Sequence, residues 1–252
     1  RHWAALFGTG IVKTLDDFGM QGELPSHPEL LDYLAVEFMD RGWSLKALHR
    51  FMVTSETYQQ DSTIRGTPSS GRELDRFVRK RLEAEIIRDA ALEASGLLED
   101  KMFGPPVRPP QPAAQAANYK KSVWKASPGA DRYRRSVYTY QMRTAPFAMF
   151  TTFDAGSGEA CIARRDASNT PLQALTLLND PMFVEIAEAF GKEIAAVEGD
   201  DEAKLVFAFR RVLTRPPDEE EMDLLRGFHA EHADWKSLAR ALLSLDEAIT
   251  KN

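Results

Sequence analysis

The feature that most constrains this chain is a set of short helix-start signals, each followed by apolar residues at helical spacing. Capping boxes, in which a Ser, Thr or Asp and a Glu or Gln three positions later bond the free N–H groups of a first turn, are expected at Ser26, Thr170 and Asp218. Pro171 and Pro181 suit the first helical position, where no N–H is needed. A helix with one apolar face must bury that face, so the sequence predicts a mainly α fold.

Apolar stripes define the expected helices. Ser44 is expected to cap the second helix, and the third is expected over 73–98 with room for a break near Lys80. The core-facing residues are expected to be Leu30, Leu31, Leu34, Ala35 and Phe38; Leu45, Leu48 and Met52; Leu82, Ile86, Ala90 and Ala94; Phe183, Ala187, Phe190 and Ile194; Leu205, Phe209 and Val212; and Trp235, Leu238, Leu242, Leu245 and Ile249.

Two stretches interrupt this helical pattern. Residues 60–71 are rich in Ser, Thr, Gly and Pro, and residues 104–131 contain several prolines, so both are expected to be loops. Residues 136–142 are rich in β-forming side chains, and a small hairpin with 147–153 is expected. We therefore expect one irregular multi-helix domain over 1–252, with lobes 1–100 and 132–252 as an alternative division joined by the Pro-rich segment 101–131.

Composition excludes several classes of protein. The net charge is −6, which disfavours nucleic-acid binding, and no apolar run approaches the roughly 20 residues that cross a bilayer. The lone Cys161 has no intramolecular disulfide partner and is expected to be a small buried hydrophobe, with a reactive thiol as the alternative. No signal peptide is recognisable, and because a natural chain does not start with arginine, Arg1 indicates a piece of a longer protein.

The stretch from 152 to 180 is the richest in polar side chains. It ends on two expected helix starts, whose free N–H groups suit anions, and Arg164 with Arg165 could form a fork for carboxylate, sulfate or phosphate. The alternative is a capped loop whose polar groups satisfy buried backbone. The candidate polar site comprises residues of this stretch together with His27 and Arg143; its members are His27, Arg143, Asp154, Arg164, Arg165, Asn169, Gln173, Asn179 and Asp180.

Other polar residues are weaker candidates. His27 could act as a base or ligand, or it could pack against the preceding loop. Asp16 and Asp17 suit either a hard cation or an exposed turn, and His229 and His232 lie three residues apart without an evident third ligand. The charged segment 81–89 fits a solvated helix face, or an internal Arg–carboxylate pair between helices. No catalytic triad, metal or cofactor motif is present, so we expect no metal and no cofactor in this chain.

Several long motifs carry a family resemblance. They lie at 19–32, 42–50, 54–58, 81–89, 104–107, 134–138 and 152–154, and the strongest is Asn-Thr-Pro-Leu-Gln-Ala-Leu-Thr-Leu-Leu-Asn-Asp-Pro at 169–181. Together they resemble the planctomycete PSD-one family, domain of unknown function fifteen fifty-three. The resemblance implies the C-terminal part of a large exported protein, behind a cytochrome c-type domain, and an extracytoplasmic location. It implies no reaction, and the chain departs from the family's usual pattern at both ends.

Three hypotheses for the function follow. The first is a non-enzymatic helical module that packs on neighbouring domains or binds an anionic or carbohydrate ligand; it predicts a large apolar surface patch. The second is a hydrolase acting on a carbohydrate or sulfated polymer, with acids such as Asp16 and Asp154 placed about 5 to 10 Å apart in a pocket. The third is structural support for an associated cytochrome c domain.

Overall fold

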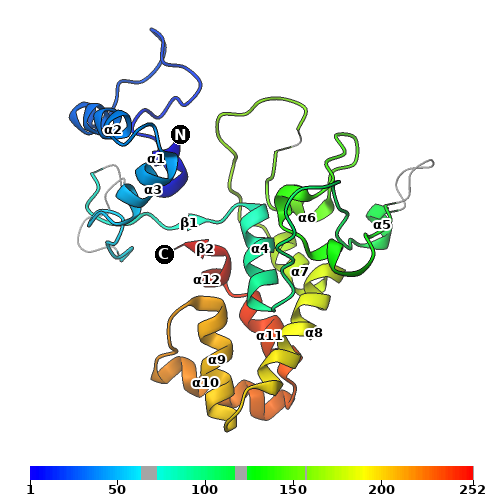
Figure 1. The fold of residues 1–252 in the computed structure, drawn as a ribbon. Coiled ribbons are helices and arrows are strands. Elements are labelled where there is room, and N and C mark those ends of the chain that lie inside the picture. Colours follow the sequence, from blue (N-terminus) through cyan, green and yellow to red (C-terminus); the bar gives the residue numbers. More distant parts are fainter. Residues whose placement is uncertain (64–72, 117–123, 157, 252) are drawn as a thin grey trace. The chain divides into compact units, whose positions relative to one another are not determined.

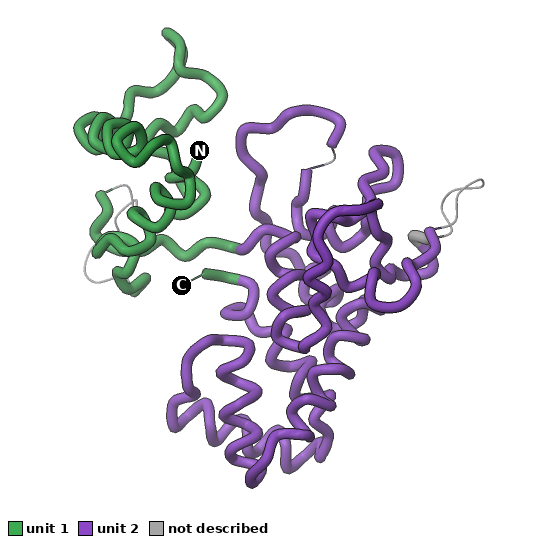
Figure 2. Tube along the Cα trace, viewed as in Figure 1, with its two compact units in different colours: residues 1–81, 250–252 green, residues 82–249 purple. Residues whose placement is uncertain are grey.

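The chain is mainly α-helical and divides into two compact units. The computed structural model describes residues 1–63, 73–116, 124–156 and 158–251 (Figure 1). Unit 1 comprises residues 1–81 with 250–252, and unit 2 comprises residues 82–249, including the Pro-rich segment (Figure 2). Within the described ranges, no helix combines the length and the hydropathy that a bilayer crossing needs.

Unit 1 contains three helices and one short antiparallel sheet among its described residues. The helices are α1 (His2–Phe7), α2 (Pro28–Asp40) and α3 (Leu45–Val53). Strand β1 (Lys80–Arg81) pairs with β2 (Thr250–Lys251), and the register places Lys80 opposite Lys251. The buried apolar residues of this unit are few: Phe7, Ile11, Leu15, Leu48, Met52 and Phe77.

Unit 2 is built around α8, which packs against α11 and α7 (Figure 1). Its described elements are α4 (Ala84–Ala94), α5 (Ala113–Ala116), the 3-10 turns η1 (Gly129–Tyr133) and η2 (Ser136–Tyr138), α6 (Ala148–Thr152), α7 (Pro171–Asn179), α8 (Pro181–Ala196), α9 (Asp201–Leu213), α10 (Glu219–His232), α11 (Trp235–Leu243) and α12 (Asp246–Ile249). A close approach at Gly191 lets the backbones of α8 and α11 meet, because a Cβ there would lie 2.8 Å from the Lys236 nitrogen. The contiguous hydrophobic core lies wholly in this unit.

Most helix starts in unit 2 follow the local signals. The capping boxes at Thr170 and Asp218 are both formed, and Asp180 caps α8 through the Met182 N–H. In α8 the predicted stripe is buried, and Leu238 and Leu242 are buried in α11. In unit 1 the expected Ser44 cap of α3 is also confirmed.

The capping box expected at Ser26 is wrong. His27 is the N-cap of α2 and makes no side-chain cap bond. The Ser26 hydroxyl instead donates to the Ile11 carbonyl at 3.2 Å, and the Ser26 N–H donates to the same oxygen at 2.8 Å. Ser26 therefore closes the preceding loop rather than the helix.

The helix expected over 73–98 is shorter than predicted. Helix α4 begins only at Ala84, because residues before it enter the short sheet and the Leu82 N–H donates to the Ile249 carbonyl at 2.9 Å. The expected row is wrong in part: Ala94 is buried, but Ile86 and Ala90 are exposed, and Ile87 and Ala91 are buried instead. Leu31, Ala35, Leu45 and Leu245 are likewise exposed against expectation.

The expected hairpin of 136–142 with 147–153 is wrong. Residues 136–138 form a 3-10 turn, and 148–152 form α6. Thr139 makes an isolated parallel bridge to Val107 of the Pro-rich segment. Phe147 and Phe150 are buried at helical spacing, which a strand would have placed on opposite faces. The loop expected at 60–71 lies mostly outside the described residues.

Candidate functional site

Asp154 and Gln173 meet at the end of α6. Asp154 adopts a left-handed backbone conformation (φ 60°), and one oxygen of its carboxylate accepts both the N–H and the hydroxyl of Ser168, each at 2.7 Å. The amide of the buried Gln173 donates to the Thr152 carbonyl at 3.0 Å and to the Ser168 hydroxyl at 3.1 Å. These bonds close the 155–168 loop onto the start of α7.

Gln173 also completes the capping box of α7. Its side-chain oxygen accepts the Thr170 N–H, and its own N–H donates to the Thr170 hydroxyl, both at 3.4 Å. Both ends of the Gln173 amide are therefore engaged inside the unit. This arrangement is the one expected of a capped loop whose polar side chains satisfy backbone groups.

Arg165 points to helix α4 instead of joining Asp154. Its guanidinium forms two bonds with Glu85, at 2.7 and 3.0 Å, and one with Glu83 at 3.3 Å. The bonds to Glu85 raise the pKa of Arg165 above its ordinary value. The pair ties the middle of the 155–168 loop to α4 across about 80 positions of sequence.

The remaining candidates are exposed or are bonded to groups close to them in the chain. Arg143, Arg164 and Asn169 are exposed, and the Asn179 amide donates to the Leu175 carbonyl of its own helix. Asp180 is buried as the cap of α8, and burial raises its pKa to about 6. His27 lies in unit 1, where its Nδ1 is 3.0 Å from the Ser26 hydroxyl.

The structure also bears on Cys161 and on the adjacent acids Asp16 and Asp17. Cys161 is exposed, so the prediction of a buried hydrophobe is wrong. Asp17 accepts the Gly19 N–H at 2.8 Å, as a turn residue does. Among the described residues, no group of three His, Cys, Asp or Glu side chains could hold a metal ion.

Arg88, which the charged segment 81–89 contains, is fully buried. It donates to the carbonyls of Arg132 and Arg134, both at 2.8 Å, and to the Ser136 hydroxyl at 3.1 Å. The neighbouring Asp89 accepts the Ser136 N–H at 2.8 Å. Burial lowers the pKa of Arg88 to about 10, so it remains charged at neutral pH. The alternative expected for this segment is an internal Arg–carboxylate pair between helices. Arg88 is internal, but its main partners are backbone oxygens.

Arg134 repeats this arrangement and is almost as fully buried. Its guanidinium donates to the carbonyls of Lys101, Phe103 and Pro105 at 2.5 to 3.2 Å and lies 4.0 Å from the centre of the Tyr138 ring. Three of the resemblance motifs, at 81–89, 104–107 and 134–138, therefore meet around two arginines. No sequence signal distinguished Arg88 and Arg134 from surface arginines, because their partners are backbone atoms far away in the chain.

Phe103 has a left-handed backbone conformation, and its side chain is exposed to solvent. Its φ is 63° and its side chain is 78% exposed. The Tyr138 hydroxyl accepts its N–H at 2.8 Å, and Arg134 binds its carbonyl. Both backbone groups are thus fixed while the ring, next to the exposed Met102, faces solvent.

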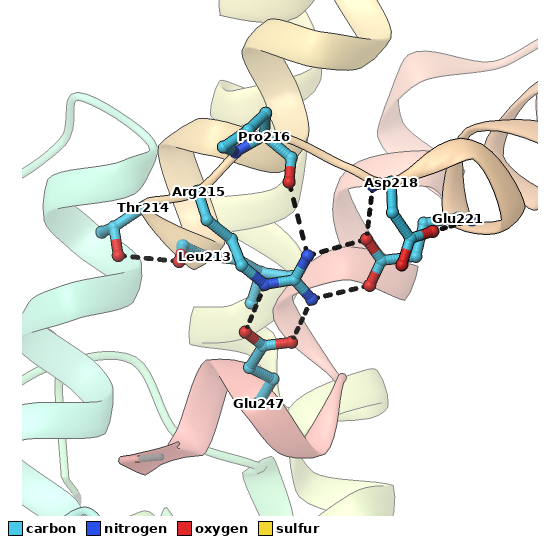
Figure 3. A network of polar contacts seen from close by, with 7 residues as sticks. All are labelled: Leu213, Thr214, Arg215, Pro216, Asp218, Glu221 and Glu247. Carbon is cyan, nitrogen blue, oxygen red and sulfur yellow. Dashed lines mark hydrogen bonds and ion pairs between the residues drawn. The ribbon is translucent and has the colours of Figure 1, made fainter. Parts of the chain in front are cut away.

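Arg215 joins three elements in unit 2. Figure 3 shows its guanidinium between two carboxylates, with two bonds to Glu221 of α10 and two to Glu247 of α12, all between 2.6 and 2.8 Å. These bonds raise the pKa of Arg215 above its ordinary value. Glu221 also completes the capping box with Asp218. This cluster stabilises the α9–α10 turn.

An open groove of about 460 Å³ lies beside that turn. Its acids are engaged by neighbours in most cases: Asp218 accepts the Glu221 N–H, and Arg226 binds Glu202 and Asp223 at 2.9 and 2.8 Å. Carboxylates committed to an arginine and a cap are poorly placed to exchange protons with a substrate.

Comparisons with known proteins give one match. No curated protein matches the chain, and no solved structure matches it. Residues 1–229 match PSD1, described as a protein of unknown function (DUF1553). This match covers most of the 252 residues. The chain therefore belongs to the PSD1 family of proteins of unknown function.

Proposed function

We propose that the chain is a non-enzymatic helical interaction module that packs on a neighbouring protein domain through α2. The observation that carries the proposal is the exposure of this helix: none of its thirteen residues is buried. Leu31, Tyr33, Val36 and Met39 are 39 to 50% exposed, and Trp43 beyond its end is 66% exposed. Exposed apolar side chains gathered on one helix in this way indicate an interaction surface.

The energetics favour covering this face. Its inner side packs on α3, so the helix is already anchored within unit 1. Removing a large apolar side chain from water contributes about 1.5–3 kcal/mol when burial is complete. Burial of several half-exposed side chains on one helix would therefore contribute several kcal/mol to association with a partner.

The polar groups of unit 2 also support a non-enzymatic role. An active site needs acids, bases or donors that face open space, where a substrate can reach them. Asp154, Gln173, Arg88, Arg134 and Arg215 are instead bound to backbone atoms or carboxylates within unit 2. In this proposal these residues stabilise the fold of unit 2.

The family resemblance indicates the setting of the module. We propose on this ground that the chain is part of a large exported planctomycete protein, outside the cytoplasm, with a cytochrome c-type domain among its neighbours. In this proposal one of those neighbouring domains covers α2. The module would then support the haem domain structurally without binding a cofactor itself.

Hydroxyl-radical footprinting tests the proposal, because it measures side-chain exposure directly. The chain alone and the longer native protein are oxidised in parallel. Tyr33, Met39 and Trp43 should be protected several-fold in the longer protein, while the control Met102, exposed in unit 2, keeps its oxidation rate. Equal oxidation of all three α2-face residues in both proteins would overturn the proposal.

A further inference from the structure

Two histidines that lie 47 positions apart meet on the surface of unit 1. His2 begins α1 and His49 lies on α3, and both side chains are exposed. The Nε2 atom of His49 is 2.9 Å from the Nδ1 atom of His2, and the ring centroids are 4.9 Å apart. We propose that this pair binds a divalent transition-metal ion of the zinc, nickel or copper type, with one imidazole nitrogen from each helix.

Packing contacts fix the two helices that carry the rings before any metal arrives. On α1, Trp3 stacks on Phe7, whose buried ring meets Tyr58 edge-on. The Lys80 ammonium donates to the Ala5 carbonyl at 2.7 Å, which fixes the same helix. On α3, the residue preceding His49 is the buried Leu48. The pair is therefore a preorganised feature of two anchored helices.

The contact itself has the chemistry of a metal site. Two ring nitrogens at hydrogen-bonding distance share one proton, since one must donate and the other accept. A metal ion takes the place of that proton and binds both lone pairs. With Zn–N bonds of about 2.0–2.1 Å in tetrahedral geometry the two nitrogens lie about 3.3 Å apart. The nitrogens therefore need to separate by about 0.4 Å, and each ring needs to turn so that its lone pair faces the ion.

The class of ion follows from the donors. Neutral imidazole suits zinc, copper and nickel, whereas calcium and magnesium prefer oxygen ligands. Because no third His, Cys, Asp or Glu of the described residues completes the set, the remaining coordination positions are open to water or an added ligand.

Zinc titration of the 252-residue chain tests this site. Calorimetry at pH 7.5 should show one zinc ion per chain, with no corresponding binding of calcium. His2→Gln and His49→Gln should each weaken zinc binding at least tenfold, because glutamine keeps a polar side chain but removes the imidazole ligand. The matched control is His232→Gln, an exposed histidine in unit 2, which should leave the affinity unchanged.

Nitrogen NMR of the unsubstituted chain gives an independent readout that needs no variant to fold. The signals of His2 Nδ1 and His49 Nε2 should shift together as zinc is added, with one stoichiometric end point. A shift confined to His2, zinc binding that survives His49→Gln, or no detectable zinc binding would each overturn the proposal. The result does not depend on whether α2 docks on a neighbour.

Discussion

Arg88 is a charged residue that has become part of the helical core. Its guanidinium binds two backbone carbonyls and a hydroxyl in the segment around η2, with no exposure to solvent. The arginine thus gives these two backbone carbonyls a hydrogen-bond partner inside the protein. The cost of burying the charge is offset only while all these bonds are made.

Replacing Arg88 by Met should therefore destabilise unit 2 strongly. The side-chain volume is nearly kept, but the buried carbonyls of Arg132 and Arg134 lose their donor, and we expect a loss of about 3–5 kcal/mol in the free energy of unfolding. Urea denaturation followed by circular dichroism measures it. Arg135→Met, at an exposed arginine of the 134–138 motif that Arg88 contacts, is the control and should stay within about 0.5 kcal/mol. Equal effects of the two substitutions would contradict this role for Arg88.

Asp180 makes the stability of unit 2 depend on pH. Burial raises its pKa from 3.8 to about 6, so between these values the folded state binds more protons than the unfolded state. Stability is then highest below pH 4 for this group and falls as the pH rises through 6. The full difference is of the order of 3 kcal/mol.

Asp180→Asn should remove this pH dependence. Asparagine caps a helix about as well as aspartate, so the Met182 N–H keeps its acceptor while the buried charge is lost. We expect the variant to exceed the original chain in stability at pH 7 and to match it near pH 4, as measured by urea unfolding across that range. Asp200→Asn, at the exposed cap of α9, is the control. If Asp180→Asn loses as much stability between pH 4 and pH 7 as the original chain does, Asp180 is not the source of the pH dependence.

At the scale of elements, the contact of α8 with α11 depends on Gly191. A Cβ at this position would meet the backbone of Lys236 at 2.8 and 2.9 Å, and neither helix backbone can move without disturbing the core. Gly191→Ala should lower the free energy of unfolding by about 1–3 kcal/mol. Gly227→Ala in α10 is the matched control, because nothing lies within 4 Å of its added Cβ.

The control should act in the opposite direction. Alanine is favoured over glycine in an exposed helix by up to about 1 kcal/mol, so Gly227→Ala should stabilise the chain slightly. Thermal or urea unfolding of both variants measures the two signs. If both substitutions stabilise the chain, the close packing of α8 and α11 is not the constraint that the geometry indicates.

Elements set by local signals were predictable from the sequence, and those set by distant contacts were not. The Thr170 and Asp218 boxes lie within four residues and were predicted correctly. The late start of α4 depends on Ile249, more than 160 positions away, and η2 depends on Asp89 through the Ser136 N–H. A β-forming composition at 136–142 could not reveal that a buried arginine binds the backbone there.

The same limit applies to the candidate site. The sequence singled out the polar stretch at 152–180, and within it Asp154 and Gln173 do meet through Ser168. The partner of Arg165, Glu85, lies 80 positions away, and that of His49 lies 47 positions away. Residue type and spacing predict which groups need partners, but only the fold decides which partners they find.

At the scale of the whole molecule, the two units differ in the size of their hydrophobic cores. Every buried residue of the hydrophobic core cluster lies between 84 and 249, within unit 2 (Figure 2). The ends of this unit are adjacent, because the Leu82 N–H donates to the Ile249 carbonyl at 2.9 Å. A contiguous segment with its own core and neighbouring ends has the properties of an independent folding unit.

Residues 82–249 expressed alone should therefore fold. We expect backbone amide spectra of the segment to superimpose on those of the 252-residue chain for the core helices α8, α9 and α11, because their buried contacts all lie inside the segment. The thermal midpoint of these helices should change by no more than a few degrees, which is the shift that a stability change of about 1 kcal/mol produces in a domain of this size. The Arg88→Met substitution in the same segment provides the internal standard for a damaged core. If the segment instead gives the broad, collapsed amide spectrum of an unpacked chain, residues of unit 1 supply stability that the hydrophobic core of unit 2 does not, and the two units form one cooperative domain.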